Sequence, residues 1–274
     1  MGNLDGRVAV VSGSGRGIGR EVALKLAAEG ARVVINDLDA EPAGQTAADI
    51  EAGGGAAAVC TGSVTDDGFA ERFVRTAVDT FGGVDIIVNN AGYTWDTVIQ
   101  KMTDEQWDTI LDVHLTAPFR ILRAAQPYLS AAAKAERARG ERVQRKVVNV
   151  SSASGVNGNP GQANYSSAKA GIIGLTKALA KEWGRYQVNV NTVAFGIIRT
   201  RMTEARADGG ATLDIGGRQI RVGVSPYLLD TLPQRVPLGR GGSPAEAAGA
   251  VYLLCTPEAD YISGQVLLCN GGLN

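Results

Sequence analysis

The sequence is poor in cysteine, in net charge and in long apolar runs, and each shortage excludes a class of protein. The three cysteines among 274 residues, Cys60, Cys255 and Cys269, lack the spacing of metal ligands, so we expect reduced thiols and no metal centre. The net charge of −1 argues against nucleic-acid or membrane-surface partners. No apolar segment approaches the ~20 residues that span a bilayer, and the N-terminus lacks a signal-peptide pattern, so we predict a cytoplasmic protein.

The chain does contain a regular alternation of short apolar runs and helix-like segments. The runs lie at residues 8–11, 33–35, 56–59, 86–88, 147–150, 188–193 and 266–269. Strands separated by helices favour a parallel sheet that is covered on both faces. We therefore predict one α/β domain over residues 1–274, a doubly wound, Rossmann-like sheet of about seven strands.

Five residues follow or close predicted strands, and this position makes them candidates for contact with a ligand. Ligands of such sheets bind beyond the carboxyl ends of the strands. We expect these residues to share one edge of the sheet: Gly13, Asp37, Asn90, Ser152 and Gly196.

A glycine-rich turn follows the first apolar run and precedes a helical pattern. Its spacing is Gly13-x-x-x-Gly17-x-Gly19, which differs from G-x-G-x-x-G because Ile18 stands where the last glycine would be. Glycines let backbone N–H groups approach a pyrophosphate, and the helix dipole favours the anion. The sequence therefore favours a dinucleotide site. The alternative is a glycine-rich turn that binds no ligand.

The next predicted strand ends at Asp37, about twenty residues beyond the glycines. A carboxylate there would accept hydrogen bonds from an adenosine ribose and repel a 2′-phosphate, which favours NAD over NADP. Arg16 argues weakly for NADP, because a guanidinium near the ribose could accept a phosphate. A strand-end residue without any ligand is the alternative.

Tyr165 and Lys169 are four residues apart, and Ser152 lies thirteen residues before the tyrosine. On a helix such a pair shares one face, so the ammonium can lie beside the phenol and favour its ionised form. A serine hydroxyl could hold a carbonyl oxygen near that phenol. This set can move a proton to or from an alcohol oxygen, although Tyr-x-x-x-Lys alone is often a surface pair.

Together these motifs resemble the short-chain dehydrogenase/reductase family from about residue 5 to the C-terminus. The resemblance also rests on Asn89-Asn-Ala-Gly92, on Gly161-Gln-Ala-Asn-Tyr165 and on a tail with Ile262-Ser-Gly-Gln-Val and Asn270-Gly-Gly272. Within the family the chain is most similar to 3-oxoacyl reductases and 3-hydroxyacyl-CoA dehydrogenase-like members.

The resemblance implies a role for each matching residue. Tyr165 would be the general acid/base, Lys169 would bind the nicotinamide ribose and lower the tyrosine pKa, and Ser152 would orient the substrate oxygen. The cofactor-binding residues would be Gly13, Gly15, Arg16, Gly17, Ile18, Gly19, Asp37, Leu38, Ser63, Val64, Asn90, Ala91, Gly92, Tyr165, Lys169, Ile198 and Thr200.

The chain departs from the family pattern at three places. His114 stands where the family usually has an asparagine that helps anchor a proton-relay water; a relay through histidine is feasible, and a neutral structural role is as plausible. Phe195-Gly196 replaces Pro-Gly near the nicotinamide, and Ser63 replaces Asp or Asn against the adenine. None of the three removes the chemistry.

Two segments are longer than the family's core requires. Residues 130–146 carry excess positive charge, which could meet the phosphates of coenzyme A or an acidic carrier protein, or could be a solvated helix end and loop. Residues at about 200–242 would form a substrate flap, with a β-hairpin over 212–222 around Gly216-Gly217 and then a short helix through Tyr227 and Leu232. An oligomer contact is the alternative for this flap.

We therefore predict an NAD(H)-dependent oxidoreductase that interconverts a secondary alcohol and a ketone. By resemblance the substrate is a 3-oxoacyl or 3-hydroxyacyl thioester, of undetermined carrier and chain length; a steroid, diol or other small secondary alcohol is the alternative. A nucleotide-binding protein without catalysis is disfavoured because Ser152, Tyr165 and Lys169 are all present. Relatives are commonly tetramers, so a homotetramer is expected, and a dimer stays open.

Overall fold

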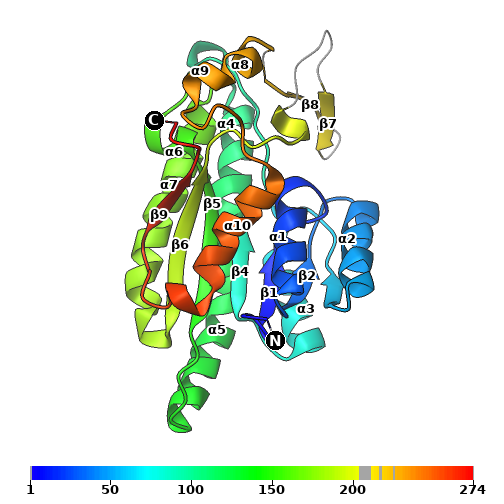
Figure 1. Cartoon of the computed structure of the whole chain (residues 1–274), viewed down its shortest axis with the longest axis vertical. Helices are drawn as coiled ribbons and strands as arrows, with labels where there is room; N and C mark the ends of the chain where they lie inside the picture. Colours follow the sequence, from blue (N-terminus) through cyan, green and yellow to red (C-terminus); the bar gives the residue numbers. More distant parts are fainter. Residues whose placement is uncertain (1, 204–210, 216–217, 225, 274) are drawn as a thin grey trace.

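The computed structural model describes residues 2–203, 211–215, 218–224 and 226–273. Its centre is a seven-stranded sheet in the order β3-β2-β1-β4-β5-β6-β9, with every neighbouring pair parallel (Figure 1). This confirms the predicted fold class. The strands are β1 (Val8–Val11), β2 (Arg32–Ile35), β3 (Ala56–Val59), β4 (Ile86–Asn89), β5 (Arg145–Ser152), β6 (Val188–Phe195) and β9 (Val266–Cys269).

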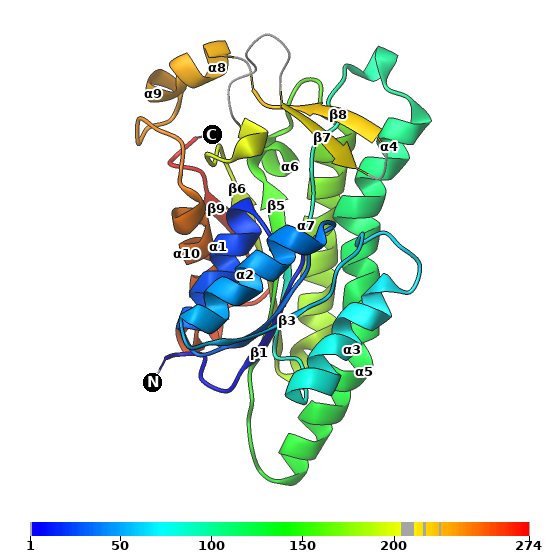
Figure 2. The same cartoon turned by 90° about the vertical axis from the view of Figure 1, so that its right-hand side faces the viewer.

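Helices cover both faces of the sheet because its strands are apolar on both sides (Figure 2). In β1, Ala9 and Val11 belong to one core cluster, whereas Val8 and Val10 belong to the other. The first face is covered by α1 (Gly17–Ala28), α2 (Ala40–Ala52) and α10 (Pro244–Cys255), and the second by α3 (Phe69–Phe81), α5 (Ala117–Ala138) and α7 (Ala163–Trp183).

The remaining helices are short, and most lie in the connections near the carboxyl edge. They are η1 (Ile99–Lys101), α4 (Asp104–Leu111), η2 (Asp112–Thr116), α6 (Ala153–Asn157), η3 (Gly184–Tyr186), η4 (Arg201–Thr203), α8 (Pro226–Asp230), α9 (Leu232–Arg235) and η5 (Pro257–Ala259). In the part of the chain that the structure describes, no helix combines the length and apolar character needed to cross a membrane.

The strand order reverses between β1 and β4, because the chain runs outward to β3 first and then returns to β4 and the strands beyond it. In an open parallel sheet, this switch point leaves a crevice beyond the carboxyl ends of the strands. The β1–α1 turn and the loop after β4 meet there, so the fold itself positions the ligand site.

The basic segment 130–146 lies at the opposite edge of the sheet. Its first part is the end of α5, which projects at the lower end of the molecule, and β5 begins at Arg145 (Figure 1). Arg145 is buried and donates to both carboxylate oxygens of Glu136, while Lys146 pairs with Asp260 at 2.7 Å. The structure contains the helix end and loop of the second interpretation, followed by the start of β5, and contact with the phosphates of coenzyme A or an acidic carrier protein stays a prediction.

The expected hairpin is present as β7 (Ala211–Ile215) paired with β8 (Arg218–Val222) in antiparallel register. The predicted turn at Gly216-Gly217 and part of the expected flap, residues 204–210, lie outside the described residues. The single short helix that we expected after the hairpin is two helices, α8 and α9, separated at Thr231.

Candidate active site

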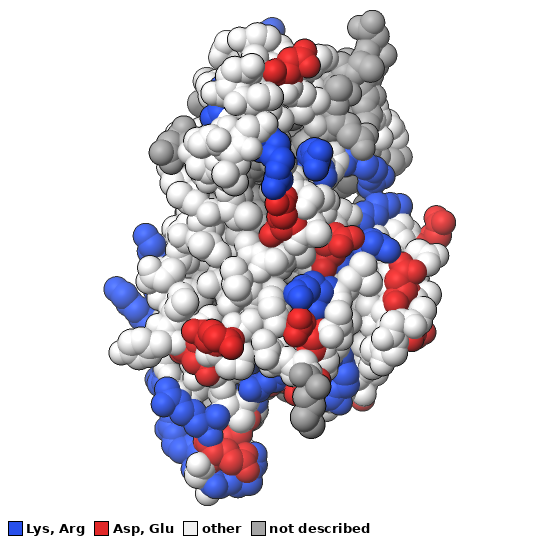
Figure 3. Space-filling model, viewed as in Figure 1, with Lys and Arg blue, Asp and Glu red and all other residues white. Residues whose placement is uncertain are grey.

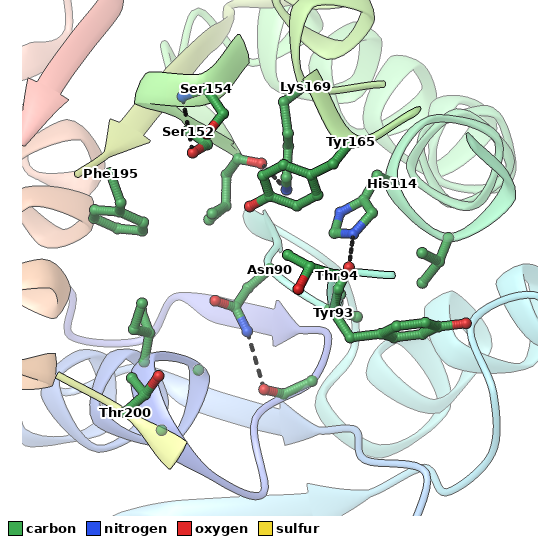
Figure 4. A pocket seen from close by; sticks show the side chains of 18 of the residues that line it. Asn90, Tyr93, Thr94, His114, Ser152, Ser154, Tyr165, Lys169, Phe195 and Thr200 are labelled. Carbon is green, nitrogen blue, oxygen red and sulfur yellow. Dashed lines mark hydrogen bonds between the residues drawn. The ribbon is translucent and has the colours of Figure 1, made fainter. Parts of the chain in front are cut away.

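A cavity of about 1600 Å³ opens at the carboxyl edge of the sheet. All predicted site residues line it except Gly15, whose amide instead donates to Asp37. Figure 4 shows Ser152, Tyr165 and Lys169 converging on one side of the cavity, with Asn90 and Thr200 on the other. The predicted convergence on one edge therefore occurs, whereas the roles of these residues stay predictions.

The glycine turn packs so closely that side chains are excluded from it. Gly13 has φ of +63°, and a Cβ on it would lie 2.7 Å from the Cα of Ala91. A Cβ on Gly19 would collide with the carbonyl oxygen of Gly13 and with the Asn90 amide. The turn leads into the N-terminus of α1, so its free N–H groups and the helix dipole make a cradle that fits a diphosphate.

Asn36 is a buried hub in this half of the cavity that the sequence reasoning missed. Its side-chain oxygen accepts from the Gly13 amide at 3.1 Å, and its side-chain nitrogen donates to the carbonyls of Cys60 and Gly62 at 3.0 Å each. It therefore ties three loops together. A polar residue closing an otherwise apolar strand was the available signal.

Asn90 joins the loop after β4 to the glycine turn. Its side-chain nitrogen donates to the carbonyls of Ser12 and Gly13, both at 3.0 Å. The Ser12 hydroxyl oxygen in turn accepts from the backbone amides of Asn90 and Ala91. These neutral hydrogen bonds hold the cradle without any ionised group.

The Asp37 carboxylate lies at the end of β2 on the cavity wall, with its side chain 13% exposed. One of its oxygens accepts from the Gly15 amide at 3.2 Å. Arg16 is already engaged by carboxylates, because its guanidinium lies 2.7 Å from Asp39 and 3.7 Å from Asp37. Ser63 and Val64 line the same cavity.

Ser152 and Tyr165 form the reactive corner. Ser152 caps α6 by accepting from the Ser154 amide at 3.1 Å, which leaves the serine proton for another acceptor. Burial raises the pKa of Tyr165 to about 12, the Ser152 hydrogen bond acts in the opposite direction, and the charge of Asp96 raises it further. The phenol is thus protonated at neutral pH.

Lys169 is buried one helical turn after Tyr165. Its ammonium donates to the Val150 carbonyl at 2.7 Å and lies 5.6 Å from the centre of the Tyr165 ring. Burial lowers the pKa of Lys169 to about 7. We expected Lys169 to lower the tyrosine pKa, and this was wrong: desolvation of the phenol dominates, and the lysine hydrogen bond goes to β5.

His114 lies in η2, a π-helical turn between α4 and α5. Its Nε2 is 2.7 Å from the Tyr93 carbonyl, so this nitrogen carries the proton, and its buried Nδ1 has no hydrogen-bond partner among the described residues. The ring meets Tyr165 edge-on at 5.0 Å. Burial, and then the charge of Lys169, holds the pKa of His114 well below 6.5, so the imidazole is neutral.

Beside Ser152 and Tyr165 the cavity wall is a polar network around Gln162, which belongs to the motif Gly161-Gln-Ala-Asn-Tyr165 but was not predicted as a site residue. Gln162 donates to Asp96 at 2.9 Å and accepts from Ser154 and Asn159 at 3.0 and 2.9 Å. All four residues line the cavity, and Gln162 immediately precedes α7. The network therefore joins the loop after β4 to the helix that carries Tyr165.

The strand β6 ends at Phe195, where Phe195-Gly196 departs from the family pattern. Phe195 is buried and lines the cavity, and a Cβ on Gly196 would lie 2.8 Å from the Cα of Asn270. Ile198 and Thr200 follow on the cavity wall as expected. Within the described segments, no group of three or more His, Cys, Asp or Glu side chains could hold a metal ion.

Comparisons with known proteins agree with this geometry. Residues 13–274 match the family model described as enoyl-(acyl carrier protein) reductase. The chain is 40% identical to 3-oxoacyl-[acyl-carrier-protein] reductase FabG of Vibrio cholerae over 99% of this chain and 98% of that protein. It is 37% identical to the FabG of Escherichia coli over 99% and 98%, and 37% identical to the 3-oxoacyl-[acyl-carrier-protein] reductase of Synechocystis over 100% and 99%. The chain therefore belongs to the short-chain dehydrogenase/reductase family, whose enzymes use a nicotinamide cofactor.

Proposed function

We propose that this enzyme interconverts 3-oxoacyl and 3-hydroxyacyl thioesters with NADH as its preferred cofactor. The observation that carries the proposal is the convergence of Ser152, Tyr165 and Lys169 in a cavity that continues to the glycine turn. The substrate class comes from the relatives, whose names specify 3-oxoacyl groups on an acyl carrier protein.

Tyr165 and Ser152 have different roles at the substrate oxygen: the tyrosine transfers the proton, and the serine donates a hydrogen bond. The nicotinamide supplies or accepts a hydride at the substrate carbon when it is bound. In reduction, the Tyr165 phenol gives its proton to the substrate oxygen, and in oxidation the phenolate takes that proton back. The Ser152 hydroxyl oxygen accepts from the Ser154 amide and keeps its own proton, which it would donate to the substrate oxygen to stabilise developing negative charge there.

Lys169 and His114 differ in what they contribute. With its pKa lowered to about 7, Lys169 exchanges protons readily near neutral pH, and its fixed hydrogen bond to Val150 holds it beside the phenol. His114 stays neutral because burial holds its pKa well below 6.5. It therefore positions the Tyr93 loop and packs against the Tyr165 ring, and it offers Nδ1 as an acceptor.

The preference for NADH rests on Asp37. Its carboxylate ends β2 at the cavity wall, where it would accept hydrogen bonds from a ribose and repel a 2′-phosphate. Arg16, the cation that could offset this repulsion, is held by Asp39 at 2.7 Å. The residues that would hold the adenosine half are Asp37, Leu38, Ser63, Val64 and Asn90.

We also propose that the chain assembles into a homotetramer. Large apolar side chains are exposed in two regions of the surface: Phe119 and Tyr128 on α5, and Leu253 and Leu268 on α10 and β9. Two separate apolar faces suit an assembly with two kinds of interface. Light scattering on the purified protein should give four times the 28.5 kDa of one chain. A dimer mass would contradict the proposal.

The test of the function is initial-rate turnover of acetoacetyl-CoA with NADH and NADPH at equal concentrations. We expect turnover with a preference for NADH. A preference for NADPH would overturn the argument from Asp37 and leave the reaction standing. Clear NADH binding without turnover of any 3-oxoacyl thioester, and with turnover of a small secondary alcohol, would contradict the substrate class.

A further inference from the structure

The cations that line the cavity are not equivalent. Arg16 pairs with Asp39, Arg120 lies 3.5 Å from Asp112, and Lys169 donates to a backbone carbonyl. Arg201 and Arg235 also line the cavity, and among the described residues no carboxylate lies within salt-bridge distance of either. These two guanidinium groups are therefore available to a ligand.

Arg201 belongs to the cofactor end of the cavity. It begins η4, directly after Thr200, and the Thr200 methyl would be 3.8 Å from a Cβ on Gly17. The segment that carries Arg201 therefore runs beside the glycine turn. Arg235 lies in α9, which Figures 1 and 2 place away from α1 and α2.

The β7–β8 hairpin forms the outer boundary of the same end. Strand β8 contacts η4, and Thr212 and Ile215 of β7 line the cavity. Figure 1 places the hairpin above α1 and α2, and Figure 2 places it next to α4 and apart from α8 and α9. Ile220 of β8 is 1% exposed, so the hairpin packs onto the body of the protein. We expected this hairpin to cover the substrate, and this stays a prediction; the structure shows that β7 contributes Thr212 and Ile215 to the cavity wall.

The geometry points to Arg201 as a binding residue for the diphosphate of the cofactor, on the side opposite the glycine turn and under the β7–β8 hairpin. This inference rests on the nicotinamide cofactor of the family and goes beyond the proposed substrate. It adds a cation to a cradle of backbone amides and the Asn36 and Asn90 side chains, in which Asp37 accepts from the Gly15 amide and Arg16 is paired with Asp39.

Charge and shape both favour this assignment. A diphosphate carries two negative charges, and the α1 N-terminus supplies only a partial positive charge. A guanidinium presents N–H donors in a planar fork that matches phosphate oxygens. Figure 3 shows blue side chains where the hairpin meets α1 and α2, with red side chains beside them.

The test is equilibrium binding of NADH, ADP and adenosine to the full-length protein by titration calorimetry, with Arg201→Gln and Arg201→Lys. We expect Arg201→Gln to weaken NADH and ADP by about tenfold, because charge-assisted hydrogen bonds are lost, and to leave adenosine unchanged. Arg201→Lys should recover part of the loss, since it keeps the charge without the fork. Arg235→Gln is the matched control and should leave all three affinities unchanged.

Three outcomes would overturn the inference. If Arg201→Gln binds NADH and ADP within twofold of the wild-type affinities, Arg201 does not contact the diphosphate. Equal weakening of adenosine would indicate a general disturbance of the site. A rise in the KM for acetoacetyl-CoA with NADH affinity intact would assign Arg201 to the substrate's phosphates. Failure of the wild type to turn over acetoacetyl-CoA would contradict the proposed substrate alone, because ADP binding does not depend on turnover.

Discussion

The two ends of the cavity are built by opposite means. The cofactor end is held by backbone groups and neutral amides, with Asn36 and Asn90 linking the loops after β1, β2, β3 and β4. The catalytic end gathers Tyr165, Lys169 and His114, of which the lysine and the histidine are buried and the tyrosine is partly exposed, and all three have shifted pKa values. Both ends lie at the same edge of the same sheet.

This difference determines whether each end of the cavity is sensitive to added side-chain volume or to a change of charge and pH. A cradle made of close backbone contacts is sensitive to added volume and nearly indifferent to pH. A corner made of buried titratable groups is sensitive to charge and protonation, because burial disfavours every charged form. Mutations and pH should therefore affect the two ends separately.

Tyr165→Phe should produce the largest effect and confine it to the catalytic end. The variant loses the proton donor, so kcat should fall by about 10³-fold or more, within the range of general acid catalysis. The cradle has no contact with the phenolic oxygen, so the NADH dissociation constant should stay within twofold. Steady-state assays measure kcat, and titration calorimetry on the same preparation measures the NADH dissociation constant. Near-normal turnover would remove Tyr165 from the chemistry.

Gly19→Ala should affect the cofactor end. Its Cβ would meet the Gly13 carbonyl oxygen and the Asn90 amide nitrogen, so the turn must open and NADH should bind at least about tenfold more weakly. The rate at saturating NADH should change less than the affinity. Gly44→Ala is the matched control, because a Cβ at this position in α2 has no atom within 4 Å. Equal losses in both variants would contradict the steric argument.

A smaller effect should appear in the pH dependence of stability. The folded-state pKa of Lys169, about 7, lies below its usual value of 10.5, so the unfolded state binds more protons between these values. The free energy of unfolding should therefore rise with pH from 7 to 9, by roughly 1.4 kcal/mol per unit at most. The raised pKa values of Cys255 and Cys269 begin to oppose this rise above about pH 8, because the unfolded thiols lose their protons near their usual pKa of 9.0.

Urea unfolding at pH 7, 8 and 9 measures this slope in the wild type and in Lys169→Met. The Val150 carbonyl loses its donor in the variant, and the rise of stability with pH should be absent, with only the fall that the buried thiols cause toward pH 9. An unchanged slope in Lys169→Met would show that another group titrates in this window.

The sequence predicted the parts of the molecule that local chemistry determines. Short apolar strands, the spacing of Gly13, Gly17 and Gly19, and the Tyr165–Lys169 pair all depend on neighbours along the chain, and the structure brings them together. The fold class was correct for the same reason, since alternation of strands and helices leaves few arrangements.

Contacts between distant segments could not be read in this way. Asn36 contacts Gly62, and Gln162 contacts Asp96, across intervals that no periodicity encodes. The pKa of Tyr165 was predicted in the wrong direction because the sequence gives the neighbouring charge but not the degree of burial. The basic segment was considered for the substrate site because charge is visible in a sequence and position in the sheet is not.

The π-helical turn η2 also changes the direction in which side chains point along one long helix, so that the parts before and after it can pack against different neighbours. Helices α4 and α5 continue through it without a break, and α4 packs on α7 while α5 packs on α3. Each residue of an α-helix advances the side chains by about 100°, so the wider turn sets the angular offset between the two packing faces. Deleting one residue from 112–116 would restore a regular α-helix. Such a helix could keep the packing of α4 on α7 or the packing of α5 on α3, but not both. Length in this segment is therefore as constrained as sequence.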